Sequence, residues 1–313
     1  MPRWNLLVTM IGASAVTLGA VPASGQARPP AILGRWDMTV RTQSDSFPSW
    51  LEVRLSGNRT LVGQFVGEFG SARPISKIEF SNGSVHFAVP PQWDRGNNDI
   101  VFDGRLDADR LAGSMTDASG ARLTWTADRA PALRPAANPR WGSPIALFNG
   151  KDLRGWHPTG ANQWQVVNGI LTSSKAGANL VTDRPFTDFK LHVEFRYPKD
   201  GNSGVYLRGR YEVQVEDSRG LELSSEHLGG VYGFLTPNQD VAKAPGEWQS
   251  FDITLVGRQV TVVLNGTMII CRQDIPGITG GALSSNEGAP GPIMLQGDHA
   301  PIEYRSVILT PAR

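Results

Sequence analysis

The sequence predicts an all-β protein of two domains, and three observations support this. The 35 glycines and 22 prolines are spread along the chain between short runs of Val, Ile, Thr and aromatic residues, which is typical of strands joined by tight turns. At 313 residues the chain exceeds one ordinary domain of roughly 150 residues. Cys271 is the single cysteine, which excludes an intrachain disulfide or a zinc site of several thiolates. Packed hydrophobic cores must therefore stabilise the fold.

Residues 1–27 have the pattern of a secretory signal peptide. Arg3 precedes a largely apolar stretch from Leu6 to Val21, and the small residues that follow predict cleavage after Ala27. The alternative, an uncleaved membrane anchor, is disfavoured because the stretch is short and interrupted by glycine. No cysteine lies near the cleavage point, so a lipoprotein is excluded, and no other segment is apolar enough to span a bilayer. We expect a soluble protein in the periplasm or outside the cell.

Residues 28–128 are predicted to form a small antiparallel barrel or sandwich. Apolar runs recur at roughly ten-residue spacing and are separated by turn signals such as Ser81-Asn82-Gly83. The role of this domain stays open at this stage. The expected strands run from Leu33 to Val40, Trp50 to Leu55, Leu61 to Val66, Ile75 to Phe80, Val85 to Val89, Ile100 to Leu106, Leu111 to Met115 and Leu123 to Thr126.

A linker at residues 129–143, marked by three prolines and no periodicity, separates this domain from a second one at residues 144–313. Asn265-Gly266 is the strongest hairpin signal, because both residues tolerate the positive φ of a tight turn. About nine strands in this half predict a two-sheet sandwich. They run from Leu191 to Tyr197, Gly204 to Arg208, Tyr211 to Glu216, Val231 to Leu235, Phe251 to Val256, Val260 to Leu264, Met268 to Cys271, Ile293 to Gln296 and Ile302 to Leu309.

The charge balance argues against a nucleic-acid partner. Thirty basic and 29 acidic residues give a net charge of +1, so no overall field attracts the chain to nucleic acid or to an anionic membrane.

The densest polar cluster lies in residues 201–218. Strand alternation places Tyr206 and Arg208 on one face, and Glu212, Gln214 and Glu216 on one face of the next strand. A solvated outer face would produce the same pattern. His299 joins the candidates because it sits in a Gly-Asp-His turn after the strand that carries Gln296, and turns commonly present side chains to ligands. The further candidates are Asn202, Lys243 and Trp248, the last as a core residue or a sugar-stacking platform.

The second domain resembles the 3-keto-disaccharide hydrolase family, also described as the 3-keto-glucoside 1,2-lyase/3-keto-2-hydroxy-glucal hydratase domain. The resemblance covers about 170 residues and leaves the first domain outside. It implies a concanavalin-like jelly roll that cleaves glycosides already oxidised at C3. The motifs that carry it are Ile145-Ala146-Leu147-Phe148-Asn149-Gly150-Lys151-Asp152-Leu153-Arg154-Gly155-Trp156, Gly201-Asn202-Ser203-Gly204-Val205-Tyr206-Leu207-Arg208-Gly209, Tyr211-Glu212-Val213-Gln214-Val215, Trp248, Leu264-Asn265-Gly266 and Gly291-Pro292-Ile293-Met294-Leu295-Gln296.

The implied chemistry is β-elimination followed by hydration. A ketone at C3 acidifies the C2 proton, so a base can remove it and expel the C1 substituent. Glu212 or His299 could be that base, while Arg208, Tyr206, Gln214 or Lys243 could stabilise the enolate. The expected catalytic residues are Glu212, His299 and Arg208, and the expected substrate-binding residues are Asn202, Tyr206, Gln214, Lys243, Trp248 and Gln296.

No redox cofactor is required, because a separate sugar 3-dehydrogenase would make the ketone, and the chain has no GxGxxG strand-to-helix unit. A divalent metal chelated by the 3-keto and 2-hydroxyl oxygens would serve the same electrostatic purpose as hydrogen-bond donors. Glu212, Asp217 and His299 are the candidate ligands, and metal dependence stays open.

Two other functions compete with this interpretation. A carbohydrate-binding module would use the same fold without a base beside an acid. A retaining endoglucanase would use two carboxylates of Glu212-Val213-Gln214-Val215-Glu216, which resembles the E-x-D-x-E strand of concanavalin-like enzymes. The neutral Gln214 disfavours it, since the middle charge that separates two carboxyl pKa values is missing.

Overall fold

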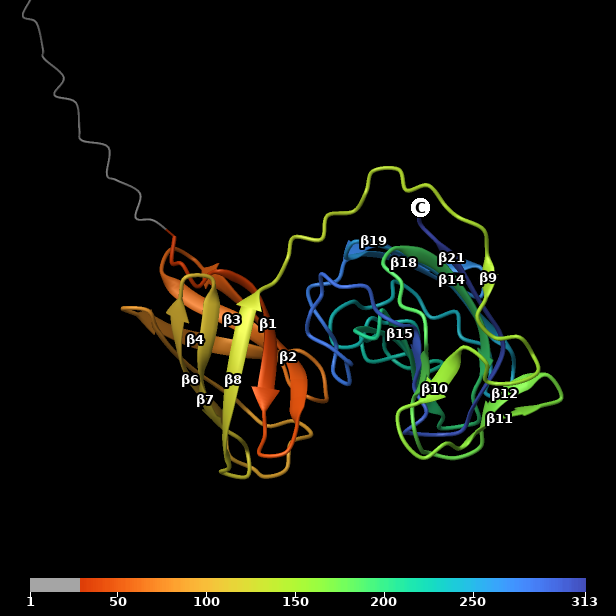
Figure 1. Cartoon of the computed structure of the whole chain (residues 1–313), viewed down its shortest axis with the longest axis horizontal. Coiled ribbons are helices and arrows are strands. Elements are labelled where there is room, and N and C mark those ends of the chain that lie inside the picture. Colours follow the sequence, from red (N-terminus) through yellow and green to blue (C-terminus); the bar gives the residue numbers. More distant parts are fainter. Residues whose placement is uncertain (1–28) are drawn as a thin grey trace, which may run out of the picture. The chain divides into compact units, whose positions relative to one another are not determined.

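The computed structural model describes residues 29–313, and all regular secondary structure in this range is β-strand (Figure 1). The predicted all-β class is confirmed. The predicted signal peptide lies outside the described residues. Within the described range, the structure contains no helix long and apolar enough to cross a membrane.

The first eight strands form a closed antiparallel barrel. Each strand pairs with its neighbour in sequence, and β1 closes on β8 with Val40 opposite Trp125. Alternate side chains fill the interior, where Phe87 stacks on Phe102 with ring centroids 4.5 Å apart. All eight strands expected in this part of the sequence are present. They are β1 (Gly34–Arg41), β2 (Ser46–Ser56), β3 (Thr60–Val66), β4 (Arg73–Ser81), β5 (Ser84–Val89), β6 (Ile100–Asp107), β7 (Arg110–Thr116) and β8 (Arg122–Arg129).

The second half forms the predicted two-sheet antiparallel sandwich. A five-stranded sheet has the order β10-β13-β20-β15-β16, and an eight-stranded sheet has the order β11-β12-β21-β14-β17-β18-β19 with β9 paired to β21. One hydrophobic core holds apolar side chains from both sheets, among them Val205 and Val193. The strands are β9 (Ile145–Ala146), β10 (Trp156–Pro158), β11 (Trp164–Val167), β12 (Ile170–Ser173), β13 (Leu180–Thr182), β14 (Phe189–Arg196), β15 (Asn202–Leu207), β16 (Tyr211–Glu216), β17 (Gln249–Val256), β18 (Gln259–Leu264), β19 (Thr267–Asp274), β20 (Met294–Leu295) and β21 (Ile302–Pro311).

The predicted hairpin at Asn265-Gly266 is confirmed, with φ values of 51° and 81° between β18 and β19. The prediction of a strand from Val231 to Leu235 is wrong. These two residues form only isolated bridges around a turn, in which Gly233 has a positive φ. The short strands β9 to β13 were not anticipated, because they contain only two to four residues each.

The barrel and the sandwich make extensive contacts, and Ile32–Arg313 forms one compact unit. Trp50 and Val66 of the barrel are completely buried among the core residues of the sandwich. The Trp50 ring meets Phe234 edge-on at 5.5 Å between centroids. A Cβ at Gly277 would lie 2.2 Å from this indole, so only glycine fits there. The Gly281 N–H donates to the Glu68 carbonyl at 2.7 Å, which ties the segment after β19 to the end of β3.

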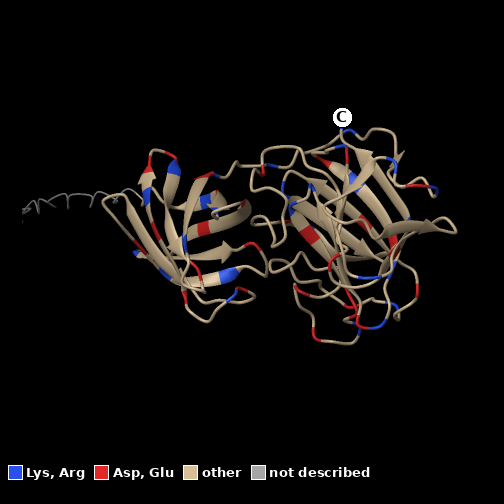
Figure 2. Cartoon of the chain, turned by 60° about the horizontal axis from the view of Figure 1, so that its bottom comes forward, with Lys and Arg blue, Asp and Glu red and all other residues tan. Residues whose placement is uncertain are grey.

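Along the strands and loops of the barrel and the sandwich, Lys and Arg residues are intermixed with Asp and Glu residues (Figure 2). This distribution agrees with the net charge of +1.

Candidate active site

The floor of the site is the β15–β16 hairpin. Its register places Asn202 opposite Glu216, Gly204 opposite Gln214, and Tyr206 opposite Glu212. Because opposite residues share a sheet face, these six positions face one side while the intervening apolar residues enter the core. The polar face lines a pocket of about 760 Å³. The alternative of a solvated outer face is thereby removed for this hairpin.

Glu212 is a buried carboxyl group within this pocket. Only 4 % of its side chain is exposed, and the Tyr206 hydroxyl donates to its Oε2 at 3.0 Å. A Cβ at Gly204 would lie 2.1 Å from Glu212 Oε1, so the glycine provides the space that this oxygen occupies. Burial raises the pKa of Glu212 to about 8, although the Tyr206 hydrogen bond and the charge of His299 oppose that rise. Glu212 can therefore exchange a proton near neutral pH.

Tyr206 can serve both protonation states of Glu212. Its hydroxyl has one proton and two acceptors within reach, Glu212 Oε2 at 3.0 Å and the Gly280 carbonyl at 2.9 Å. When Glu212 is ionised, the phenol can donate to the carboxylate. When Glu212 is protonated, the carboxyl can donate to the phenol, which then donates to Gly280. Burial and the Glu212 charge raise the pKa of Tyr206 well above its usual value, so the phenol keeps its proton.

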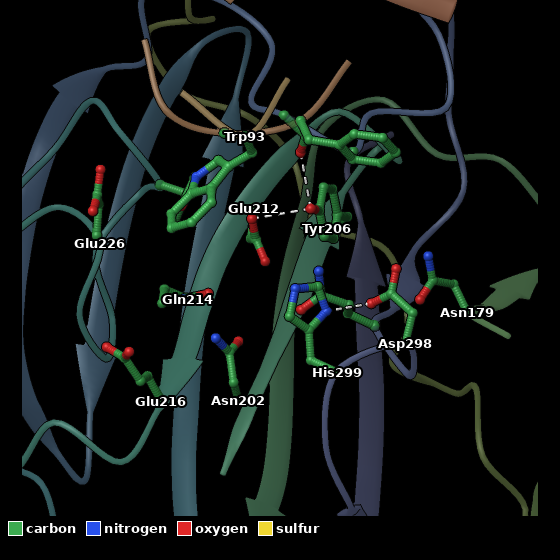
Figure 3. Close-up of a pocket in the computed structure, with 16 residues that line it drawn as sticks. Trp93, Asn179, Asn202, Tyr206, Glu212, Gln214, Glu216, Glu226, Asp298 and His299 are labelled. Atoms are coloured by element: carbon green, nitrogen blue, oxygen red, sulfur yellow. Dashed lines mark hydrogen bonds and ion pairs between the residues drawn. The ribbon is translucent and has the colours of Figure 1, made fainter. Parts of the chain in front are cut away.

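His299 and Asp298 face Glu212 from the segment after β20 (Figure 3). His299 Nδ1 lies 2.5 Å from Asp298 Oδ1. This hydrogen bond raises the pKa of His299, and burial opposes the rise. The ring is thus oriented at Nδ1 and leaves Nε2 for a ligand. An acid and a base converge on one pocket, which a purely binding site would not need.

Asn179 supplies a free amide donor beside this pair. Its Oδ1 accepts a hydrogen bond from the Gly297 N–H at 2.8 Å, so its Nδ2 is the group left for a ligand. The sequence contained no signal for Asn179, because the residue precedes the three-residue strand β13 and reaches the site only through the pairing of β13 with β20.

Several buried acceptors in the pocket lack hydrogen-bond partners. They are Gln214 Oε1, Gln296 Oε1 and Glu216 Oε2. A buried polar atom without a partner is costly, and such atoms in a cavity mark positions for ligand donors. A ligand with hydrogen-bond donors would satisfy them.

The barrel also contributes to the wall, which the sequence did not indicate. Phe69, Gly70 and Trp93 line the pocket together with Tyr232 and Glu226 from the loop after β16. Trp93 lies in the β5–β6 loop, far from the polar cluster in sequence.

Arg208 does not line the pocket, although alternation had placed it beside Tyr206. β15 ends at Leu207, and Arg208 adopts φ 53° in the turn, which breaks the alternation. Its buried guanidinium donates from Nη2 to the Gly257 carbonyl and to the Tyr211 hydroxyl. Arg208 therefore stabilises the hairpin turn instead of contacting a ligand in this pocket.

Lys243 and Trp248 also lie outside the pocket. Lys243 donates to the Trp248 carbonyl at 2.8 Å. The Trp248 ring is covered by the guanidinium groups of Arg196 and Arg305, at 4.8 and 4.6 Å from the ring. These cation–π contacts occupy the ring with side chains of β14 and β21, so it is not free to stack on a sugar.

The residues present do not fit a metal held by three protein ligands. Glu212 and His299 line the pocket, whereas Asp217 does not and accepts a hydrogen bond from the Asp200 N–H. Among residues 29–313, no three His, Cys, Asp or Glu side chains are grouped closely enough to hold a metal ion.

Three solved structures illustrate the likeness of this chain to known folds. Two candidate glycosyl hydrolases from Parabacteroides distasonis are 29 % and 25 % identical, covering 56 % and 54 % of this chain and 92 % and 98 % of their own, with TM-scores of 0.47 and 0.44. A non-specific endo-β-1,3(4)-glucanase of family GH16 is 10 % identical over 59 % of this chain and 96 % of its own, with a TM-score of 0.38. All three scores are below 0.5, so they carry no weight in the assignment.

The assignment rests on a family model. No curated protein matches the chain. The model for the 3-keto-alpha-glucoside-1,2-lyase-like domain matches residues 143–310, which is more than half of the chain and includes every residue that lines the pocket except Phe69, Gly70 and Trp93 of the barrel. The chain is therefore a carbohydrate-active enzyme that belongs to the 3-keto-alpha-glucoside-1,2-lyase-like family.

Proposed function

We propose that the enzyme cleaves 3-keto-glycosides by β-elimination and then hydrates the product, which gives net hydrolysis. One observation carries the proposal: the buried carboxyl of Glu212, with its raised pKa, shares a pocket with the oriented imidazole of His299. Elimination from a glycoside needs a base at C2 and a proton donor at the departing oxygen. The two side chains supply these roles.

In the elimination step, Glu212 removes the C2 proton, and the C1–O bond breaks as the C1–C2 double bond forms. The departing oxygen takes a proton from His299 Nε2. Negative charge that develops on O3 is stabilised by the Asn179 amide and other donors of the pocket. The products are a 2-hydroxy-3-keto-glucal and an alcohol.

Hydration reverses the roles of the two groups. Neutral His299 takes a proton from water as the oxygen adds to C1, and Glu212 returns its proton to C2. The sum is one glycosidic bond broken and one water consumed, with both side chains restored. All electron pairs are accounted for without a redox cofactor. The ketone must come from a separate oxidation at C3, and we place both steps in the periplasm or outside the cell.

The test uses two substrates with different leaving groups. Methyl 3-keto-glucoside needs an acid at the departing oxygen, whereas 4-nitrophenyl 3-keto-glucoside does not. Glu212→Gln should lower kcat/KM on both substrates by about 10²- to 10⁴-fold, because the base is lost. His299→Ala should cause a comparable loss on the methyl substrate and a much smaller loss on the aryl substrate. The reverse pattern would make His299 the base and Glu212 the acid.

Released alcohol and enone absorbance are followed with and without EDTA. A transient enone supports elimination, and loss of turnover with EDTA would add a metal to the route. His299→Ala lacks the base of the hydration step and should accumulate the enone. Release from the aryl substrate without any enone, in wild type and in His299→Ala alike, would contradict elimination. If no substrate is cleaved while unmodified oligosaccharides bind, the chain is a carbohydrate-binding module.

A further inference from the structure

Trp93 is an unusual residue for its place in the fold. Its side chain is 70 % exposed, yet it lines the pocket that holds Glu212. It belongs to the barrel and lies outside residues 143–310, which match the family model. Figure 3 shows its indole on the side of the pocket that also holds Glu226, with His299 and Asp298 on the other side.

The loop that carries Trp93 is fixed on both sides of the residue. On one side, Gln92 accepts a hydrogen bond from the Ser71 N–H at 3.0 Å and donates to the Ser71 hydroxyl at 2.9 Å. On the other, Asp94 pairs with Nη1 of the buried Arg73 at 2.7 Å, and the same nitrogen donates to the Pro90 carbonyl. An exposed indole is thus held in place before any ligand arrives.

Gly70 adds a close contact behind this indole. A Cβ at Gly70 would lie 2.9 Å from Trp93 Cδ1 and 2.4 Å from Gln92 Oε1. The Cδ1 edge of the ring therefore packs against the Gly70 backbone, while 70 % of the Trp93 side chain stays exposed. Phe69, which is 59 % exposed, lines the same pocket, and an exposed aromatic patch of this kind is typical of a binding surface.

Acceptors for hydroxyl groups lie on the same wall. The Glu216 side chain lines the pocket and is 31 % exposed, and its Oε2 has no hydrogen-bond partner, with His227 Nε2 4.0 Å away. Glu226 also lines the pocket, on the side that holds Trp93 (Figure 3). An aromatic side chain and carboxylate acceptors on one side of a pocket match a sugar ring, which has apolar C–H faces and an equatorial rim of hydroxyls. The pocket volume of about 760 Å³ lies within the range of roughly 300–1,000 Å³ for ligands of the size of a disaccharide.

We propose that the barrel completes a subsite for the leaving group, in which Trp93 stacks on a second sugar ring while Glu216 and Glu226 accept its hydroxyl hydrogen bonds. This inference rests on the proposed function, because it assumes that the oxidised ring occupies the Glu212 side. It makes Trp93 a specificity-determining residue and gives the barrel a direct part in substrate choice.

The experiment compares a 3-keto-disaccharide with the methyl 3-keto-glucoside of the same anomeric configuration. Trp93→Ala should lower the ratio of kcat/KM for the disaccharide to kcat/KM for the methyl substrate by about tenfold, the size expected for a lost aromatic contact with its buried area. Trp93→Phe should restore most of the ratio. Met268→Ala on β19, a matched control that is 46 % exposed and outside the pocket, should leave the ratio unchanged.

A binding measurement separates this inference from the proposed function. The unmodified disaccharide should bind Glu212→Gln with about tenfold higher affinity than it binds Glu212→Gln/Trp93→Ala, as measured by titration. Methyl glucoside should bind the two variants with equal affinity. That result supports the subsite even if no substrate is turned over. The proposed subsite would be overturned if Trp93→Ala changed neither the disaccharide affinity nor the ratio of kcat/KM values. An equal loss of kcat/KM on both substrates would also overturn it, because it would indicate a general disturbance of the pocket.

Discussion

Gly204 is the residue at which one added methyl group should be most damaging to the site. A Cβ there would lie 2.1 Å from Glu212 Oε1, and this carboxyl is too buried to move away freely. We expect Gly204→Ala to lower kcat/KM by about 10²-fold or more, because a displaced base loses its alignment with the C2 proton. Steady-state kinetics on the aryl 3-keto-glucoside would measure this loss.

Gly160→Ala is the control for that substitution. A Cβ at Gly160 would meet nothing closer than 3.7 Å, which is ordinary contact, so activity should be retained. Equal activity of Gly204→Ala and Gly160→Ala would show that Glu212 can tolerate displacement, and would argue against its role as the base.

The raised pKa of Glu212 predicts a pH dependence. A base must be ionised, and a carboxyl with a pKa of about 8 is roughly one-tenth ionised at pH 7 and half ionised at pH 8. With the aryl substrate, which needs no acid, kcat/KM should rise with pH up to about 8. A profile that falls over this range would assign Glu212 the role of the acid.

The sequence predicted many of the residues that the fold brings together. Glu212, Gln214, Asn202 and Tyr206 line the pocket because strand alternation and hairpin register both follow from a period of two. Alternation fails at Arg208, where the positive φ of a turn reorients the side chain. Gln296 and His299 line the pocket as well, whereas residues from distant loops, such as Asn179 and Trp93, depend on tertiary contacts that no local pattern encodes.

At the scale of elements, the β15–β16 hairpin depends on the turn formed by the three residues between its strands, Arg208, Gly209 and Arg210. Arg208 and Gly209 have φ values of 53° and 61°, as the twist of a tight hairpin requires. The 3 % exposed Arg208 side chain holds this turn to the Gly257 carbonyl. We expect Arg208→Ala to lower the free energy of unfolding by about 2–4 kcal/mol, since a buried hydrogen bond and a packed side chain are lost. The folded fraction should retain kcat/KM within about threefold of wild type, well short of the loss of a general acid or base.

Thermal unfolding and active-site titration would test that expectation together. If Arg208→Ala were as stable as wild type but had a much lower kcat, Arg208 would have a catalytic role, as the sequence analysis expected. Arg208→Lys offers a milder comparison, because it keeps the charge but not the fork of donors.

Element prediction succeeded where strands were long and failed where they were short. The barrel strands have six to eleven residues with clear alternation, and all were anticipated. The run from Val231 to Leu235 has strand-like composition, but Gly229, Gly230 and Gly233 surround or interrupt it and two of the three have positive φ. Tertiary packing against the barrel then decides its conformation, as the Trp50–Phe234 contact illustrates.

At the scale of the whole molecule, the contact between barrel and sandwich contains a buried acidic pair. Asp37 of β1 accepts a hydrogen bond from the Glu287 N–H at 3.1 Å, and Glu287 is fully buried with Arg258 at 3.0 Å and the Tyr211 hydroxyl at 2.6 Å. Burial, then the charge of Glu287, raises the pKa of Asp37 to about 7.

This raised pKa predicts how stability changes with pH. The folded state binds the Asp37 proton more tightly than the unfolded state, whose pKa is 3.8. The resulting stabilisation is complete below pH 3.8 and is lost as pH rises through about 7. Asp37→Asn keeps the acceptor oxygen and removes the charge, so it should raise Tm at pH 8 by about 2–4 °C and flatten the Tm profile between pH 4 and 7.

Asp128→Asn is the matched control, because Asp128 is opposite Asp37 on β8 but is 74 % exposed. It should leave Tm at pH 8 within about 1 °C of wild type. A Tm gain in Asp128→Asn equal to that in Asp37→Asn would indicate a general effect of net charge instead of a buried acid.

β21 follows every other strand of the sandwich in the chain, yet it is hydrogen-bonded between β12 and β14 in the middle of the eight-stranded sheet. The barrel, in contrast, pairs mainly neighbours in sequence. Local pairing closes quickly and distant pairing slowly, so during synthesis the barrel can fold while the sandwich waits for residues 302–311. The part of the pocket that the barrel contributes, including Trp93, would then form before the sheet that carries Glu212. The complete catalytic pocket would be the last part of the molecule to form.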